Sequence, residues 1–510
     1  MVNYRFSLKI LLILVAALGT GLTGHAHAQD GGINLTLKQA IKMAVEKNLD
    51  VKAELYNPAA AEADIRKNKG IYDPLVSFNT NYDESTTQPP SIFLAGTTLQ
   101  RTKILTIDPG ISQLIPYGGT LGLFFNNTWN RNNSSLERGF LNDYWQSELT
   151  LTFTQPLLKN FGREATELNI SVAKYNKQGS WEQFKTRLVD VIAQVRTQYF
   201  QLYSLRENLE VRKTSLALAE KILSDTRAQV KAGVLPAMEI LSAEFGVATM
   251  QKNLIDAERA LKDQVDALAV LLQLPVGGDI VPVDDPYRER YEVDEPSTIN
   301  KALAQRPELK QLQVTLKSNE LQSRVARNQT LPDLSFVANG ALTGLGISYS
   351  KDLDKLGSGD FPIWGVGLQF SYPLGNRTAE NDYIRSKLLV GQTRVQVKSL
   401  QDTIVNDVRN AVRALQSGYI QLDVTARGSA YAEERLQAFI KRNKVGLATT
   451  KDVLDVQNDL VTAKGNQIQA VTDYNNAITA LWRSSGELLE KEGIKVTEAE
   501  ADSLYEKNRN

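Results

Sequence analysis

Residues 231–241 read Lys231-Ala-Gly-Val-Leu-Pro-Ala-Met-Glu-Ile-Leu241, and residues 444–454 read Lys444-Val-Gly-Leu-Ala-Thr-Thr-Lys-Asp-Val-Leu454. The two segments align without a gap, so that Gly233 matches Gly446. Each glycine interrupts a long helical pattern that resumes a few residues later, and glycine is the residue best suited to the left-handed turn that ends a helix. The repeat therefore predicts two long helical hairpins of one duplicated architecture.

The stretches that lead into these turns are helical over an unusual length. Neither Glu164–Val230 nor Thr378–Lys444 contains a proline. Apolar residues recur three and four positions apart, as at Leu188, Val191 and Val195, which is the spacing of a coiled-coil seam. At 1.5 Å per residue, each stretch spans roughly 100 Å as one helix.

Two segments with a period of two precede the long helices. Apolar residues alternate with polar ones from Trp145 to Phe153, and with smaller or polar ones from Trp364 to Tyr372. About ten alternating residues form a strand that crosses a bilayer when tilted in a barrel. The first half holds two further strand-like runs, near Lys103–Ile115 and Thr120–Trp129, which either add strands to a barrel or form an external flap.

The N-terminus resembles a secretory signal, and the composition excludes several classes of enzyme. Residues 1–28 combine a basic start, an apolar core and the small-residue cleavage site Ala26-His27-Ala28. Both histidines lie in this segment and the chain has no cysteine, so the mature protein lacks Ser-His-Asp, Cys-His and His/Cys zinc sites. We expect no enzyme, cofactor or metal; the carboxylates Asp352 and Asp354 are interpreted as loop charges. The 58 basic and 58 acidic residues give no reason to expect nucleic acid.

A secreted chain with bilayer-length amphipathic strands points to the outer membrane. Four to six strands cannot close a barrel, and open strand edges are not tolerated in lipid. A ring of identical chains solves this problem, and long helices attached to the strands then extend the barrel into a tunnel. The alternative is a structural or adhesive coiled-coil protein that spans the periplasm without a pore.

Several motifs, in order along nearly the whole mature chain, resemble the TolC-type outer-membrane efflux proteins. They are the opening Leu35-Thr-Leu-x-x-Ala-Ile, Arg306-Pro-Glu-Leu, the strand ends Gln155-Pro-Leu157 and Tyr372-Pro-Leu374, and both glycine turns. The resemblance implies an α+β membrane protein: a homotrimeric, twelve-stranded β-barrel continuous with an α-helical coiled-coil barrel in the periplasm of a Gram-negative bacterium, with two internal repeats. The implied function is the exit duct of a tripartite efflux or type I secretion system. The implied partners are outer-membrane lipid, a periplasmic adaptor, and an inner-membrane pump or ATP-driven exporter that selects the cargo.

The resemblance also assigns roles at the helical tips. Asp452 and Asp455 match the acidic rings that narrow the periplasmic entrance, with Glu239 as a third gate residue, although two charges near a helix N-terminus need no such role. The family's closing arginine is replaced by Ala448 and its aspartate partner by Glu239, so the latch is absent as written, and Lys444 and Lys451 are candidate substitutes. The predicted adaptor contacts are Gly233, Val234, Leu235, Gly446, Leu447 and Ala448.

The same reasoning divides the mature chain into four parts. The first repeat covers 29–275, with strands at about 72–155 and a helical hairpin at 164–274 that turns at 231–237. A linker at 276–296 leads to a second repeat at 297–486, with strands at about 331–374 and a hairpin at 378–484 that turns at 444–450. Residues 487–510 form a charged tail.

Overall fold

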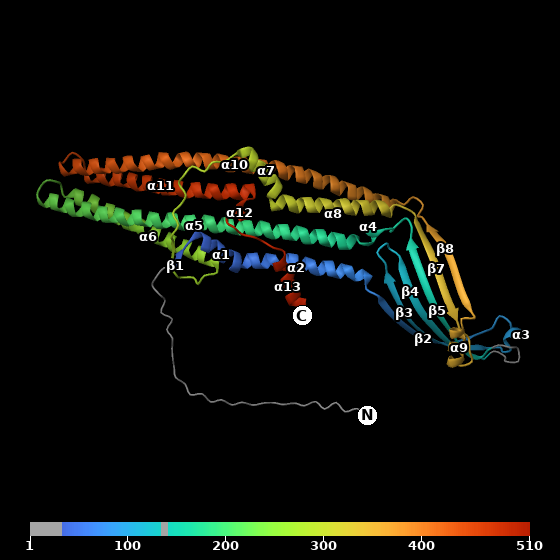
Figure 1. The fold of residues 1–510 in the computed structure, drawn as a ribbon. Helices are drawn as coiled ribbons and strands as arrows, with labels where there is room; N and C mark the ends of the chain where they lie inside the picture. The colour runs from blue at the N-terminus through green and yellow to red at the C-terminus, as the bar shows by residue number, and fades with distance from the viewer. Residues whose placement is uncertain (1–32, 134–140, 510) are drawn as a thin grey trace, which may run out of the picture.

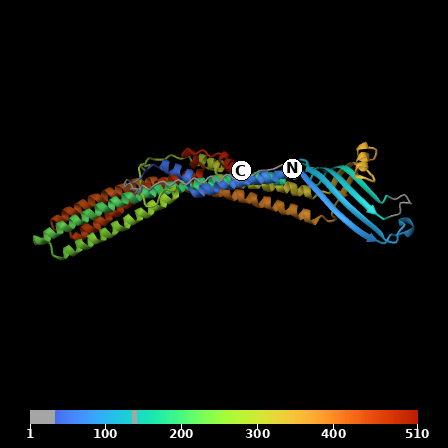
Figure 2. The same ribbon diagram turned by 90° about the horizontal axis from the view of Figure 1, so that it is seen from below.

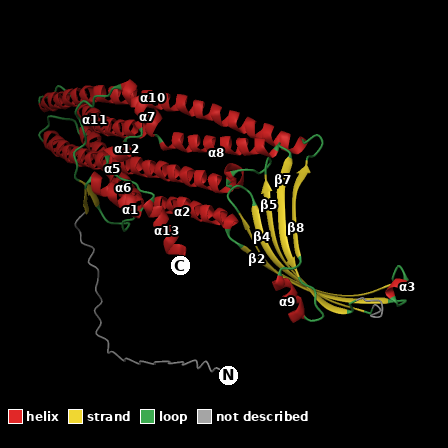
Figure 3. Cartoon of the chain, turned by 45° about the vertical axis from the view of Figure 1, so that its right-hand side comes forward, coloured by secondary structure: helices red, strands yellow, loops and turns green. Residues whose placement is uncertain are grey.

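The computed structural model describes residues 33–133 and 141–509, so the predicted signal peptide lies outside the described residues. The molecule is a long rod with a curved sheet at one end (Figure 1, Figure 2). Helices run from the sheet to the opposite end, where two turns form the tips. The long helices and the six long strands occupy separate lengths of the rod (Figure 3).

Four helices lie side by side next to the sheet, in the order α2, α5, α8, α10, and each contacts the next. Helix α5 has 64 residues and α10 has 68. Neither contains a proline, which would kink or break a helix of this length. Each of these two turns back at its tip into a return helix, α6 or α11. The bounds are α2 Leu49–Lys69, α5 Leu168–Lys231, α6 Met238–Leu272, α8 Pro307–Gln329, α10 Arg377–Lys444 and α11 Thr450–Ser485.

The strands form one six-stranded antiparallel sheet in the order β2-β3-β4-β5-β7-β8. Both strand-like runs of the first half belong to this sheet, as β3 and β4, between β2 and β5. The short helices α3 and α9 lie at the end of the sheet away from the long helices (Figure 1). The bounds are β2 Leu75–Thr87, α3 Ile92–Ala95, β3 Gln100–Leu114, β4 Thr120–Asn132, β5 Asp143–Pro156, β7 Asp333–Thr343, α9 Tyr349–Ser358 and β8 Pro362–Ser371.

Strands and helices are arranged in the same lateral order. Helix α2 leads into β2 through the short helix η1, Gly70–Tyr72, and β5 leads into α5 through α4, Arg163–Thr166. Helix α8 leads into β7, and β8 leads into α10. Each of the four helices beside the sheet is therefore connected to the strand that occupies the corresponding lateral position.

Short elements surround the middle of the rod. Strand β1 pairs in parallel with β6, which lies inside the predicted linker. The C-terminal helix α13 is tied to the rod by Lys177, whose ammonium lies 2.6 Å from Asp502 and 2.8 Å from Glu62. The bounds are β1 Ile33–Leu35, α1 Leu37–Lys47, β6 Ile280–Pro282, α7 Glu295–Gln305, α12 Leu488–Lys491 and α13 Ala499–Arg509.

Apolar packing runs along the helix seams. One cluster joins α1, α5 and α6 around Ile192, Tyr199 and Leu268. A second lies between α10 and α11, and a third joins both hairpins near the tips through Met250 and Val453. This third cluster holds the two tips together within one chain.

Among the described residues, none of the helices combines the length and the apolar character needed to cross a bilayer.

Candidate functional site

The register of the sheet sorts its side chains onto two faces, because directly paired residues of antiparallel strands share a face. Leu151 pairs with Leu123 on one side and with Gly340 on the other. Such direct pairs continue without a break across all six strands, so each residue of the sheet can be assigned to one of two faces. One face is apolar over most of its height. Its apolar members are Val76, Phe78, Tyr82, Leu105, Ile107, Ile111, Leu121, Leu123, Phe125, Trp129, Trp145, Leu149, Leu151, Phe153, Leu334, Phe336, Ala338, Leu342, Trp364, Val366, Leu368 and Phe370.

Aromatic residues end this apolar band away from the helices, and charged residues lie beyond them. Tyr82, Trp129 and Trp145 lie in one row across the sheet, on its side far from the helices, and the next residues outward on the same face include Arg131 and Asp143. Aromatic rows between an apolar band and charged residues mark the water interfaces of membrane barrels.

The opposite face is polar, with Ser, Thr, Asn or Gln on every strand. It carries the carboxylates Asp83, Asp108, Glu148 and Asp333, and within the six described strands it carries no Lys or Arg. Two of these carboxylates bond along their own strands: Asn81 donates to Asp83, and the Thr150 hydroxyl donates to Glu148 at 2.6 Å. A wall of this composition holds water and favours cations over anions.

Asp352 is buried, so its interpretation as a loop charge is wrong. It lies in α9, which packs on the apolar face, and its carboxylate accepts hydrogen bonds from the Ser147 backbone amide, at 3.2 Å, and from the Ser147 hydroxyl. Ser147 and the neighbouring Asn127 are polar residues of an otherwise apolar stripe. Helix α9 covers both residues. Its Asp352 supplies the hydrogen-bond partner that the buried Ser147 hydroxyl requires. Asp354 is exposed, so the two carboxylates do not form an acid–base pair.

The two tips share one turn geometry. Gly233 and Gly446 have φ of 74° and 75°. The amide of the residue after each glycine donates to the carbonyl five positions back, from Val234 to Gln229 at 2.9 Å and from Leu447 to Arg442 at 2.9 Å. This is the Schellman arrangement, which satisfies the last carbonyls of a helix and requires the left-handed backbone of glycine.

Asp452 caps the second return helix. Its carboxylate accepts from the backbone amide and the hydroxyl of Thr449, both at 2.8 Å, while the Asp452 amide donates to the Thr449 hydroxyl at 3.1 Å. These bonds from Thr449 lower the pKa of Asp452 from its ordinary value. The carboxylate is therefore ionised and held at the helix N-terminus, as a capping box requires.

Glu239 and Asp455 have different partners. Glu239, at the start of α6, accepts a hydrogen bond from the backbone amide of Thr450 in the other hairpin at 2.9 Å. Asp455 lies 2.6 Å from Lys451, and this contact raises the pKa of the lysine. Lys451 thus pairs within its own helix. Glu239 bonds across to the other hairpin, as Gln457 of α11 does with the Ser215 carbonyl of α5 at 2.6 Å.

An apolar groove of about 400 Å³ lies between the two return helices near the tips. Met238 and Phe245 of α6 line it and are 75% and 76% exposed. From α11, Lys451 and Leu454 contribute. Gly246 forms the floor, where an added Cβ would come within 2.6 Å of the Leu454 side chain. The close contact between Gly246 and Leu454 holds α6 and α11 together at the floor of the groove, and the rim of the groove is exposed to solvent.

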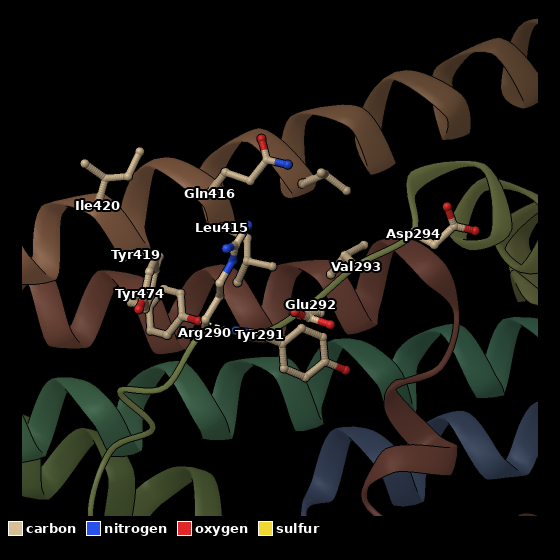
Figure 4. Close-up of a pocket in the computed structure, with 11 residues that line it drawn as sticks. Arg290, Tyr291, Glu292, Val293, Asp294, Leu415, Gln416, Tyr419, Ile420 and Tyr474 are labelled. Atoms are coloured by element: carbon tan, nitrogen blue, oxygen red, sulfur yellow. Dashed lines mark hydrogen bonds between the residues drawn. The ribbon is translucent and has the colours of Figure 1, made fainter.

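A second cavity, of about 840 Å³, lies at the middle of the rod (Figure 4). Residues 290–294 lie against α10 and α11 there, and Arg290 and Tyr419 are among the residues that line the cavity. The Tyr474 hydroxyl accepts from the Tyr291 amide at 2.9 Å and donates to the Glu289 carbonyl at 2.7 Å. Burial raises the pKa of Tyr474. These bonds attach the segment at residues 289–291 to α11 of the second hairpin.

Comparison with known proteins places the chain in a family. The model of the outer membrane efflux protein family matches residues 120–273 and 298–487. The outer membrane efflux protein BepC of Brucella suis is 25% identical over 67% of this chain and 73% of its own length. Two solved outer-membrane channels share the fold at 16% identity: OprN, with a TM-score of 0.66 over 88% of this chain and 90% of its own, and CmeC of Campylobacter jejuni, with 0.64 over 92% and 89%.

The chain belongs to the outer membrane efflux protein family. The predicted resemblance is confirmed, and so are its outer-membrane location and its role as an exit duct for efflux.

Sequence reasoning missed three features of the site. Asp352 was not recognised as a buried anchor, and the exposed Phe245 and the cross-hairpin bond of Glu239 were not foreseen. Phe245 had a detectable signal, because an aromatic residue stands where the matching position of the second hairpin, Asn458, is polar.

Proposed function

We propose that three copies of this chain form one closed duct, with the sheets as a β-barrel in the outer membrane and the hairpins as a helical barrel in the periplasm. The observation that carries the proposal is the register of the sheet, which gives one apolar and one polar face across all six strands. Apolar side chains then contact lipid, and the polar face lines a water-filled lumen.

The free edges of the sheet support closure by further copies. Strands β2 and β8 are the edges of the described sheet, and their residues are almost all exposed. Backbone groups at such edges cannot remain unpaired in hydrocarbon. A ring of identical chains pairs each β2 with a neighbouring β8 and leaves no edge.

The tips are the proposed contact with the periplasmic adaptor of an inner-membrane pump or exporter. The turn residues Gly233, Val234, Leu235, Gly446, Leu447 and Ala448 project beyond the ends of α5 and α10, where Val234 and Leu447 are 62% and 68% exposed. Exposed apolar side chains at the end of a rod are typical of a docking surface.

The proposed gate at the tips consists of Asp452, Asp455 and Glu239. In a three-chain ring each position becomes a set of three charges around the axis, which favours cations. Because Asp452 also caps α11, its substitution changes helix stability as well as charge. Asp455 is therefore the cleaner probe of charge at the entrance.

Two measurements test the duct. Native mass spectrometry of the detergent-extracted protein is expected to give three chains, and reconstitution in planar bilayers is expected to give stepwise conductance with a preference for cations. Asp108→Asn with Glu148→Gln, on the polar face, should reduce this preference and leave the mass unchanged. A monomer that stays silent in bilayers overturns the proposal and favours a structural coiled-coil protein.

A further inference from the structure

We propose that all six strands of each chain enter the barrel wall, so that the closed ring has eighteen strands and not the twelve expected from the resemblance. This inference rests on the proposed three-chain duct. It concerns the hairpin β3–β4, which the sequence left open as either part of the wall or an external flap.

The hairpin is fully integrated into the sheet. Strand β3 pairs with β2 along its length and with β4 on its other side, and β4 pairs with β5 from Thr120 to Arg131. Without β3 and β4, β2 and β5 would have to meet directly. The described sheet places them three pairings apart.

The turn of the hairpin is anchored at the helical end of the sheet. Gly118 has φ of 87°, and its amide donates to the Ile115 carbonyl at 2.9 Å. The Tyr117 carbonyl accepts from the Gln155 side chain at 3.0 Å and from the Gly162 amide at 3.3 Å. An added Cβ at Gly118 would come within 2.6 Å of the Asn160 carbonyl oxygen. This close packing at the β5–α4 junction fits a wall strand, because a flap would have to move away from it.

The faces of the hairpin are in phase with the rest of the wall. Ile107 and Ile111 of β3, with Leu123 of β4, share the apolar face. Thr106 and Asn126 share the polar face. A flap surrounded by water has no physical reason to keep this alternation in register with its neighbours.

The width of the helical layer also favours six strands. Helices pack roughly 8–10 Å apart, so the four helices beside the sheet occupy about 30–40 Å of the ring. Strands about 4.8 Å apart and tilted by about 40° take about 6.3 Å of circumference each, so six need about 38 Å and four only about 25 Å. The width of six strands therefore matches the width of the four helices, whereas four strands would be narrower.

The two edges are compatible in direction. Strand β2 leaves the helices and β8 returns to them, so β2 of one copy lies antiparallel to β8 of the next. The ring is then antiparallel throughout, with an even strand number, as in bacterial outer-membrane barrels. An eighteen-stranded barrel is about 36 Å across between backbones and leaves an aqueous channel. The backbone of such a barrel therefore does not itself close the duct.

The experiment uses the complete protein in lipid vesicles, where the absence of cysteine gives a clean background. Ile111→Cys places a thiol on the apolar face of β3, and Ser112→Cys places one on its polar face. A charged maleimide should label Ser112→Cys at least about tenfold faster, because lipid excludes the reagent. Leu151→Cys and Thr152→Cys on β5 are the matched pair, since β5 lines the barrel in either case.

The two proposals fail separately. If the β5 pair differs but both β3 thiols label at the rapid rate of Thr152→Cys, the hairpin is a flap and the eighteen-stranded barrel is wrong while the duct stands. If the β5 pair labels equally, or if native mass spectrometry shows a monomer, the duct itself fails. Each variant is first required to give the wild-type oligomer mass, and Thr106→Cys with Ile107→Cys serves as a second β3 pair.

Discussion

The two helical tips have the same turn and differ in how the return helix begins. The second return helix begins with a capping box, in which Thr449 and Asp452 satisfy each other's backbone amides. The first return helix has Ala237 at its N-cap position, which offers no side-chain cap, and the exposed Met238, Leu241 and Phe245 follow it. Two tips with the same turn thus differ, since one has its own cap and the other has an exposed apolar surface.

The difference shows how the first tip is held. Glu239 does not cap its own helix and instead accepts from the amide of Thr450, the first residue of α11. Thr226 and Thr450 also approach each other, with 3.4 Å between their hydroxyl oxygens. The second tip is therefore held by its own cap, whereas the first, which carries the exposed apolar residues, is held by a bond to the second. Four substitutions and one pH titration test this division of roles.

The largest effect is expected from Phe245→Asn, which gives the first tip the residue found at the matching position of the second. The side chain is 76% exposed, so folding and oligomer mass should not change. If Phe245 anchors the adaptor, affinity should fall by about tenfold or more, as for an aromatic hot spot. Efflux-dependent growth in the presence of a pump substrate measures the loss. Lys252→Gln, on the same helix, is the control, and equal growth of both variants contradicts the docking role.

Glu239→Gln should loosen the contact between the tips. A hydrogen bond from a backbone amide to a carboxylate contributes about 1.5–3 kcal/mol, and a neutral amide oxygen accepts more weakly. Single-channel recordings are expected to show a larger open fraction at zero voltage. Glu244→Gln removes a neighbouring carboxylate that pairs with Arg227 inside the first hairpin, and it should leave the open fraction unchanged. If both variants behave like wild type, Glu239 does not hold the tips together.

Thr449→Ala should loosen the first turn of α11 by about 1 kcal/mol, the usual contribution of an N-cap. Hydrogen exchange of the amides in residues 450–454 measures this change. Thr462→Ala, which removes a hydroxyl that bonds within the same helix to the Asn458 carbonyl, is the control. Unchanged exchange in Thr449→Ala would show that the cap does not stabilise the tip.

The cap should also depend on pH. The folded-state pKa of Asp452 is lowered by its bonds from Thr449. Its stabilisation is therefore fully present above the pKa of the unfolded chain and is lost as the pH falls through the folded value. The opening equilibrium of residues 450–454, obtained from exchange rates corrected for the intrinsic effect of pH, should shift towards the open state over this acidic range. The first turn of α6 should not show the same curve, because it lacks a capping box.

The smallest effect is expected from Asp455→Asn, which removes one exposed charge per chain at the proposed entrance. Reversal potentials in a salt gradient should shift slightly towards zero, because exposed charges are screened by salt. Asp256→Asn is the matched control, since Asp256 pairs with Lys252 at 2.8 Å as Asp455 pairs with Lys451 at 2.6 Å. Equal shifts in the two variants would place Asp455 away from the narrow point.

Local patterns in the sequence predicted the local structure. The seam around Leu188 and the glycines at 233 and 446 indicate the long helices and their turns, because helix formation depends on neighbours along the chain. The bond of Asp352 to Ser147 joins residues 205 positions apart, and that of Glu239 to Thr450 joins residues 211 apart. No periodicity signals such a pair. The place of β3 and β4 in the sheet likewise depends on long-range register, so their alternation predicted strands without predicting their neighbours.

An electron cryomicroscopy map of the full-length protein in lipid nanodiscs would test the closed duct most directly. We predict three chains around one axis, with the face that bears Leu151 against lipid, the face that bears Thr152 lining the lumen, and Glu239 in contact with Thr450 at each tip. A single chain, or a ring whose apolar face lines the interior, would contradict the proposed duct.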